Sequence, residues 1–361
     1  MKRSRIVVII LTLLFCVSLF PMPALAANYI EIFGNTWNTS TYAKVVENKI
    51  ETDGAGPDDF NIYWDAENAK LTLKDVDMDI ENLSITADLE NLQINLIGKN
   101  TFSVSKNING DFYFISNTGK MSITGAQDAL LDIDVTLNDN VMGNIGIISA
   151  DGSITNSTSL DLLLSVPEES SFTVKLYCIL SGWSRGSQGG LENSGAITAK
   201  TERMSLSGSS SNIYAIYIIG GPMHNSESGT LDLTGITTNG SIACLAGNYI
   251  PYESSWTNDG TILASATAYG GSYPGFTGSA FSNHACAISV YSNYDALMMT
   301  NNGYMDLYAV NYGQNKGYEY AIGMEFESSA TNFINKGTID IQALQGYTFG
   351  MYLPTLEEDS F

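Results

Sequence analysis

The chain has 361 residues, with 38 acidic and 16 basic side chains, and its formal net charge is −22. Such an acidic surface repels phosphate backbones, which argues against nucleic acid as a partner. Only 15% of residues are charged, Gly (34) and Tyr (20) are numerous, and Pro (8) is scarce. This mixture is typical of many short strands joined by tight turns, in either two domains or one continuous solenoid.

The first 26 residues predict a secretory signal peptide. Basic residues at positions 2, 3 and 5 precede an apolar run at 6–20, and small residues follow at 24–26. The run is shorter than the roughly 20 residues that span a bilayer, although an uncleaved anchor stays an alternative, and no later stretch could span a membrane. Cleavage after Ala26 would give a secreted or cell-surface protein with a formal charge of −25 instead of −22.

Residues 27–110 predict a β region that caps the chain and forms its first short coils. A pattern within 60–104 joins an aromatic residue and Asp to Leu-Thr-Leu and then to Leu-x-Ile-x-Leu-x-Gly-x-Asn-Thr. Its residues are Trp64, Asp65, Leu71, Thr72, Leu73, Leu92, Ile94, Leu96, Gly98, Asn100 and Thr101. This pattern resembles a module of large secreted surface proteins of gut Firmicutes and related bacteria, often described as carbohydrate-binding. The resemblance implies a surface location and glycan binding.

Residues 111–361 repeat a unit in which a turn precedes an alternating strand. The turn glycines are Gly195, Gly229, Gly260, Gly303 and Gly337, with weaker copies at Gly119 and Gly152. Successive glycines lie 33, 43, 34, 31, 43 and 34 residues apart. Three pairs of these glycines are each 108 residues apart, Gly152 and Gly260, Gly195 and Gly303, and Gly229 and Gly337, which indicates a duplicated block of three units. A sustained period of this size predicts a repeat architecture.

Each unit continues with a variable loop and a second apolar strand, and none has helical periodicity. We therefore predict an all-β protein, a parallel β-helix or solenoid with a short-coil β region at its N-terminus, whose turns pair at about 4.8 Å. The most loop-like stretch is 165–192. The repeats resemble the β-solenoid passengers of bacterial adhesins and autotransporters. The C-terminal LPTLEEDSF is not an LPxTG sorting signal, so we expect either non-covalent anchoring or a truncated chain.

The turn residues have a structural explanation. Glycine tolerates positive φ at a bend, and asparagine can hydrogen-bond its counterpart one turn away to form a ladder. The predicted structural turn residues are Asn193, Gly195, Asn258, Gly260, Asn301, Gly303, Asn335 and Gly337.

Three cysteines follow the leader, Cys178, Cys244 and Cys286. Their odd number and wide spacing do not indicate a disulfide framework, and no Cys-x-x-Cys pair suggests zinc. Free core cysteines are expected, with a Cys244–Cys286 bridge as the alternative.

Few residues suggest catalysis. His224 and His284 lie outside known nucleophile motifs. Asp232, Asp306 and Asp340 share one place in their units, and Asp306 and Asp340 would stack about 5 Å apart in consecutive turns. They are solvated charges, a calcium stripe or a catalytic acid pair. No cofactor other than calcium is indicated.

Aromatic residues crowd the loops of neighbouring units. Aromatic rings beside Asn and Asp can stack on sugars, although packing on the outer face of the solenoid is the alternative. The candidate ligand-binding residues are Tyr252, Trp256, Tyr269, Tyr273, Phe276, Tyr312 and Tyr318.

The sequence favours a non-enzymatic, adhesin-like β-solenoid at the cell surface, with glycans or host and cell-surface molecules as partners. Two alternatives stay open. One is a β-solenoid polysaccharide lyase or glycoside hydrolase. Basic residues are scarce after position 203, which argues against such an enzyme acting on acidic sugars. The other is a structural stalk.

Overall fold

A computed structural model describes most of the chain. The described residues are 28–81, 83–106, 110–137, 142–166, 173–183, 188–203, 211–238, 240–248, 255–269, 284–291, 297–313, 320–327, 331–345 and 347–352. All their regular elements are strands. Within these ranges, no helix has the length and apolar character needed to cross a membrane. The predicted signal peptide lies outside the described residues, as do Tyr252, Tyr273, Phe276 and Tyr318.

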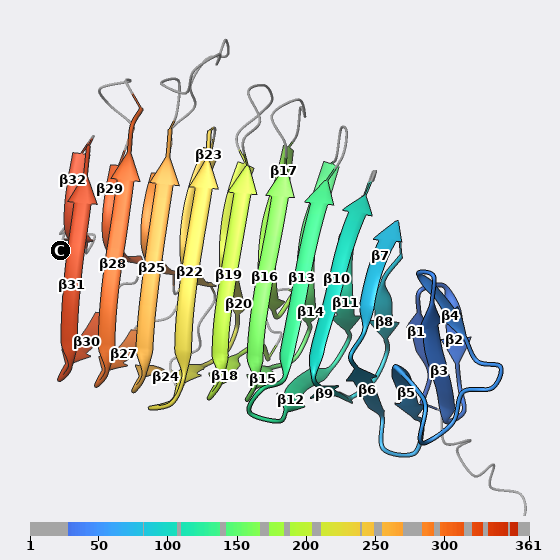
Figure 1. The fold of residues 1–361 in the computed structure, drawn as a ribbon. Helices are drawn as coiled ribbons and strands as arrows, with labels where there is room; N and C mark the ends of the chain where they lie inside the picture. The colour runs from blue at the N-terminus through green and yellow to red at the C-terminus, as the bar shows by residue number, and fades with distance from the viewer. Residues whose placement is uncertain are drawn as a thin grey trace, which may run out of the picture.

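The N-terminal end of the molecule is built from antiparallel strands. They are β1 (Ile30–Ile32), β2 (Asn35–Trp37), β3 (Thr41–Val46), β4 (Lys49–Glu51) and β5 (Ile62–Asp65). β1 pairs with β2 and β8, whereas β5 joins β3 to β6. These strands close one end of the stack seen in Figure 1.

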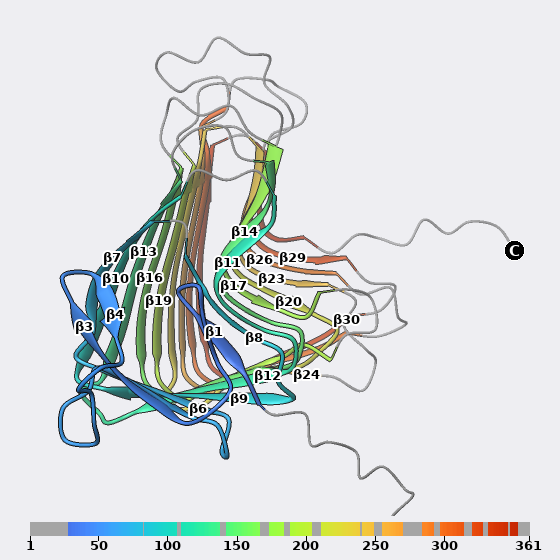
Figure 2. The ribbon, with the colours of Figure 1, turned by 90° about the vertical axis from the view of Figure 1, so that its right-hand side faces the viewer.

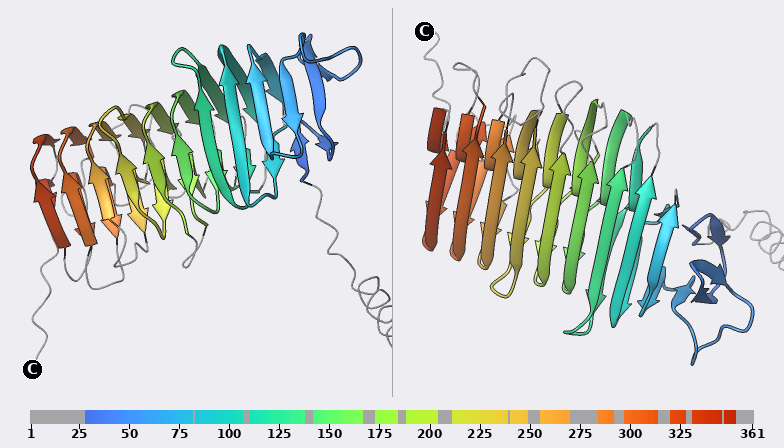
Figure 3. Two further views of the ribbon diagram at one scale, coloured as in Figure 1. Left: turned by 90° about the horizontal axis from the view of Figure 1, so that it is seen from below. Right: turned by 45° about the horizontal axis from the view of Figure 1, so that its top comes forward.

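From β6 onward the strands come in triplets, and each triplet forms one coil of a parallel β-solenoid. This confirms the predicted fold class. Every coil contributes one strand to each of three sheets, which run the length of the molecule (Figures 1 and 3). Seen along the axis in Figure 2, the coils superpose on one three-sided outline.

We call the three sheets I, II and III. The solenoid strands of sheet I are β8 (Ile85–Ala87), β11 (Phe112–Asn117), β14 (Met142–Ala150), β17 (Thr173–Ser181), β20 (Ser211–Ile219), β23 (Gly240–Asn248), β26 (His284–Tyr291), β29 (Tyr320–Glu327) and β32 (Tyr347–Tyr352). Sheet II consists of β7 (Asp77–Glu81), β10 (Lys99–Lys106), β13 (Leu130–Leu137), β16 (Ser159–Val166), β19 (Ala196–Arg203), β22 (Thr230–Thr237), β25 (Thr261–Ala268), β28 (Tyr304–Asn311) and β31 (Thr338–Leu344). They contribute to sheet III β6 (Lys70–Lys74), β9 (Asn91–Ile97), β12 (Lys120–Gly125), β15 (Ile154–Asn156), β18 (Leu191–Asn193), β21 (Met223–Asn225), β24 (Ser255–Asn258), β27 (Leu297–Asn301) and β30 (Thr331–Asn335).

Each coil therefore has three strands, where the sequence pattern predicts two. From the coil that begins with β18 onward, the unpredicted strands are those of sheet III, and β18 and β21 have only three residues. Two apolar–polar alternations are too few to separate such a strand from a turn, which is why the pattern missed them.

Alternating side chains build a continuous core inside the coils. In β13, Leu131, Ile133 and Val135 are fully buried, whereas Asp134 between them faces solvent. The core cluster runs without interruption from Ile30 to Phe326. Because full burial of one such side chain contributes about 1.5–3 kcal/mol, the stacked interior is the main source of stability.

Sheet I bends in the middle of its strands, so its outer side is concave (Figure 2). At the bend two consecutive residues point inward, for example Ile147 and Ile148 in β14. Outward residues on either side of the bend then face each other. They form a second apolar cluster of Tyr113, Tyr177, Leu180, Tyr217, Ile219, Ala243, Ala246, Cys286 and Ile322. We call this outer side of sheet I the concave face.

Candidate functional site

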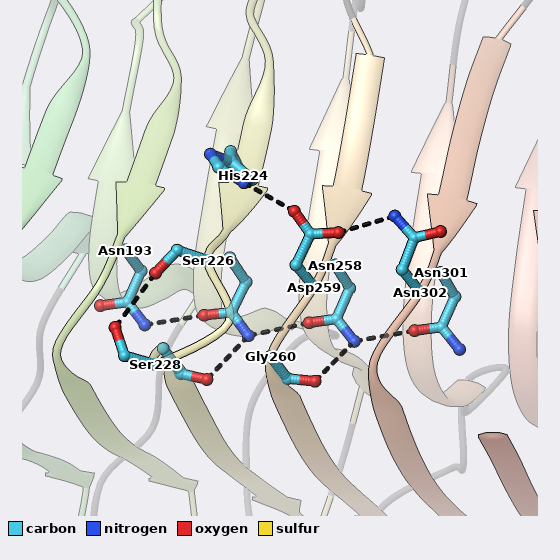
Figure 4. A network of polar contacts seen from close by, with 11 residues as sticks. Asn193, His224, Ser226, Ser228, Asn258, Asp259, Gly260, Asn301 and Asn302 are labelled. Atoms are coloured by element: carbon cyan, nitrogen blue, oxygen red, sulfur yellow. Dashed lines mark hydrogen bonds and ion pairs between the residues drawn. The ribbon is translucent and has the colours of Figure 1, made fainter. Parts of the chain in front are cut away.

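A ladder of asparagine side chains follows the corner between sheets III and II (Figure 4). Each Nδ2 donates to the next Oδ1 at 2.8–2.9 Å, which links consecutive coils. All members except the last are fully buried. The ladder consists of Asn156, Asn193, Asn225, Asn258, Asn301 and Asn335. These amides stabilise the scaffold.

The glycines of the same corner are required by close packing. The expected positive φ is wrong, because Gly260, Gly303 and Gly337 do not have positive φ. Instead, a Cβ on Gly260 would lie 2.2 Å from the carbonyl oxygen of Gly229, and one on Gly303 would lie 2.0 Å from that of Gly260. Each coil presses its backbone against the next, and a side chain has no room.

The ladder also corrects the repeat register. Gly119 and Gly152 belong to a different corner, between sheets I and III, where the Gly152 amide donates to the Gly119 carbonyl at 3.1 Å. The first 108-residue spacing is therefore wrong as a coil repeat. Ladder residues lie 37, 32, 33, 43 and 34 positions apart. The Asn-x-Gly pattern missed Asn156 and Asn225, since glycine does not follow two residues after either.

Trp256 does not present its ring to a ligand, so this predicted site residue is wrong. Its position on β24 points inward, the side chain is fully buried, and its Nε1 donates to the Gly221 carbonyl at 3.3 Å. A Cβ on Gly247 would lie 2.4 Å from the Trp256 ring, so this glycine makes room for the indole. The sequence pattern predicts a loop here, but Trp256 lies in the four-residue strand β24 and takes one of its inward positions.

Tyr269 and Tyr312 lie together on neighbouring coils. They follow β25 and β28 at the corner where sheet II passes to sheet I. Their rings stack with centroids 5.3 Å apart and planes 16° apart, and Tyr312 is 40% exposed. Backbone hydrogen bonds to the preceding coil fix both residues, with Tyr269 N donating to Thr237 O and Tyr312 N to Ala268 O.

Asp306 and Asp340 are direct neighbours in register on the outer side of sheet II. Asp232 is separated from them by Leu263, so the acidic row is interrupted. Within the described residues, no group of three or more His, Cys, Asp or Glu side chains is arranged to hold a metal ion. Calcium binding and an acid pair stay predictions.

Acidic residues also lie close together on sheet II nearer the N-terminus. Asp132, Asp134 and Asp161 lie on β13 and β16, where Lys99 Nζ contacts Asp132 Oδ2 at 3.1 Å. Burial raises the pKa of Asp134, and the nearby Asp132 and Asp161 carboxylates add to this effect. Burial and Asp132 likewise raise the pKa of Asp161. This surface disfavours anionic ligands.

The two histidines have different surroundings. His224 Nε2 lies 3.0 Å from Asp259 Oδ2, and Asn302 Nδ2 donates to Asp259 Oδ1 at 2.6 Å (Figure 4). The hydrogen bonds from Asn302 and His224 lower the pKa of Asp259. This chain of contacts joins three consecutive coils beside the ladder. His284 instead contacts the edge of the Tyr320 ring, with centroids 4.9 Å apart.

All three described cysteines are free and buried. Cys244 and Cys286 sit on adjacent strands but on opposite sides of sheet I, because Cys244 belongs to the inner core and Cys286 to the concave face. The alternative Cys244–Cys286 bridge is therefore wrong. Burial raises the pKa of Cys178 and of Cys244 to about 12.

The concave face carries a run of stacked tyrosines. Tyr214 stacks on Tyr217 with centroids 4.5 Å apart and on Tyr177 at 5.4 Å. Further along the same face, Glu325 is 6% exposed and accepts a hydrogen bond from Ser289 Oγ at 3.2 Å. Burial raises the pKa of Glu325. Sequence reasoning missed this face, since it depends on the bend of sheet I.

The residues of the carbohydrate-module pattern serve the fold. Trp64, Leu71 and Leu73 are fully buried. Asp65 accepts the Glu67 and Asn68 amides at 3.1 and 3.3 Å and so caps a turn. None of these contacts requires a ligand.

The fold assigns this chain to the all-β parallel solenoids, with antiparallel strands at its N-terminal end. No protein family, no curated protein and no solved structure matches the chain.

Proposed function

We propose that this protein is an exported, non-enzymatic, adhesin-like β-solenoid that binds neutral glycans. The observation that supports this proposal best is the Tyr269–Tyr312 pair, which combines a half-exposed ring with a backbone fixed on consecutive coils. Rigid aromatic rings next to polar groups are what saccharide sites use for stacking. The stacked coils hold the two rings at a defined spacing, so little ordering is required on binding.

The charge of the protein favours neutral over acidic sugars. Its net charge is −22, and the carboxylates of sheet II are not neutralised by an equal number of basic groups. An acidic polysaccharide would approach against this field.

A glycan array with the mature chain, residues 27–361, tests the proposal. Tyr312→Ala should weaken binding about tenfold, because loss of a stacking aromatic costs about 1–1.5 kcal/mol. Tyr304→Ala is the matched control, since Tyr304 is equally exposed at 39% on the same coil but at a different corner. Equal losses in both variants, or no neutral glycan bound, would refute the site.

Two additions separate the alternatives. Repeating the array with a chelator tests calcium binding at Asp306 and Asp340. If calcium binds there and supports glycan binding, the chelator should lower glycan binding to the unchanged protein but have no effect on the Asp340→Asn variant. Release of reducing ends or unsaturated sugars from bound polysaccharide would instead identify an enzyme and overturn the non-enzymatic proposal.

A further inference from the structure

On one side of the bend, the concave face has a glycine on one strand between large side chains on the two neighbouring strands. β14 presents Gly146 in register with Tyr113 of β11 and Tyr177 of β17. A Cβ on Gly146 would lie 2.6 Å from Cδ1 of Tyr113, so the tyrosine ring occupies the space over this glycine. On the other side of the bend, β14 presents Ser149 beside Leu180.

Trp183 reaches this region from the end of β17. Its ring packs edge-on against Tyr113, with centroids 4.8 Å apart and planes 75° apart. Its backbone amide donates to Asp151 Oδ1 at 3.2 Å. Trp183 is 42% exposed, whereas Trp37, Trp64 and Trp256 are at most 7% exposed. Among the described tryptophans, only Trp183 presents a large part of its ring to solvent, and this ring lies against a tyrosine of the concave face.

Two buried hydroxyl groups on the concave face have no hydrogen-bond partner within the described structure. They are Tyr113 Oη and Ser149 Oγ. Ser149 is fully buried and Tyr113 is 8% exposed. Buried polar groups are nearly always paired, so two orphans on one face require an explanation. Burial and the nearby Asp111 carboxylate raise the pKa of Tyr113, which keeps this hydroxyl protonated as a donor.

We propose that Trp183, Tyr113 and Ser149 form a subsite for one pyranose unit of a neutral glycan, with the indole as stacking platform and the two hydroxyls as hydrogen-bonding groups. This proposal rests on the proposed glycan-binding function and names a second site for it. Both hydroxyls are closed to solvent in this structure, so binding moves the Trp183 side chain, which is partly in solvent already. The Asp111 and Asp151 carboxylates nearby exclude acidic sugars from the subsite.

Tryptophan fluorescence tests the subsite directly, because Trp183 is the exposed one of the described tryptophans. Short oligosaccharides of glucose, mannose, galactose and N-acetylglucosamine are titrated into the mature chain and its variants. We expect a saturable emission change that Trp183→Phe removes. Tyr291→Ala is the control and should leave the emission change unaltered. Tyr291 is an exposed aromatic residue at the C-terminal end of β26, just as Trp183 follows the C-terminal end of β17.

Ser149→Ala and Tyr113→Phe give the decisive comparison. Each removes a hydroxyl that lacks a partner, so the melting temperature should stay unchanged or rise, whereas affinity should fall about 5- to 10-fold, the value of one hydrogen bond. A drop in stability with unchanged affinity would show that both hydroxyls serve only the fold and would overturn the subsite.

The two glycan proposals fail in different ways. If Tyr312→Ala weakens binding as expected while the Trp183, Ser149 and Tyr113 variants bind normally, the proposed function stands and the subsite is wrong. If the array detects no neutral glycan, both are wrong.

Discussion

Replacing a ladder asparagine in the middle of the stack should strongly destabilise the solenoid. In the folded protein Asn258 Nδ2 donates to Asn301 Oδ1 at 2.8 Å, and also to Gly260 O and Tyr304 O at 3.2 and 3.3 Å. Its Oδ1 accepts from Asn225 Nδ2 at 2.8 Å. Asn258→Ala removes all of these contacts and leaves Asn301 Oδ1 without its partner in a buried corner.

The magnitude follows from ordinary hydrogen-bond energetics. A net hydrogen bond contributes about 0.5–1.5 kcal/mol, and a buried group left unpaired costs about 1–3 kcal/mol. Asn258→Ala should therefore lower the free energy of unfolding by about 3–5 kcal/mol. With a denaturant slope of about 3 kcal/mol per molar, the urea midpoint followed by circular dichroism should fall by about 1 M or more.

Asn335→Ala is the matched control, because Asn335 has the same place in its coil but ends the ladder in solvent. It accepts from Asn301 and donates to Gly337 O at 3.3 Å. Its loss should cost less than about 1 kcal/mol. Equal effects of the two substitutions, or a midpoint unchanged by Asn258→Ala, would refute the claim that the buried amides hold the coils together.

Three further predictions follow from close packing, burial and charge. Gly303→Ala places a Cβ 2.0 Å from the Gly260 carbonyl oxygen, so it should lower the free energy of unfolding in urea by about 1–3 kcal/mol or prevent folding. Gly56→Ala, with no atom within 4 Å of the new Cβ, should leave this free energy unchanged. Glu325→Gln should raise the stability of the fold at pH 8, because burial raises the pKa of Glu325 in the folded state and so penalises its charged form. The gain in stability should vanish below the ordinary carboxyl pKa of 4.5, where the side chain is protonated in both the folded and the unfolded state. A gain that persists in acid would contradict this explanation. The buried thiols should not react with a thiol reagent in natively folded protein of residues 27–361 but should all react after unfolding. Reactivity of the native protein near neutral pH would show that the coils open.

The sequence by itself determined the class of fold. Strand alternation, the recurring turn and the absence of helical periodicity all follow from local chemistry, because inward and outward residues of a strand alternate and a coil repeat must return to the same corner. The asparagine ladder was predictable for the same reason, since identical residues at one corner stack on each other. The pairing of Asp306 with Asp340 and the nearness of Tyr269 to Tyr312 also follow from the coil repeat.

The three-dimensional structure decided which side of the backbone each side chain takes and which corner each turn occupies. Trp256 points inward because it takes an inward position of the four-residue strand β24, where a shift of one residue would reverse its face. Gly152 turns at a different corner from Gly195, since it lies between strands of sheets I and III and Gly195 lies between strands of sheets III and II. The bend of sheet I coincides with two consecutive inward residues in each of β11, β14, β17, β20, β23 and β26, which the alternation expected of a strand does not predict. Only the tertiary structure brings Trp183 against Tyr113. The sequence alone therefore determined the scaffold, and the tertiary structure determined the face on which we place the second binding site.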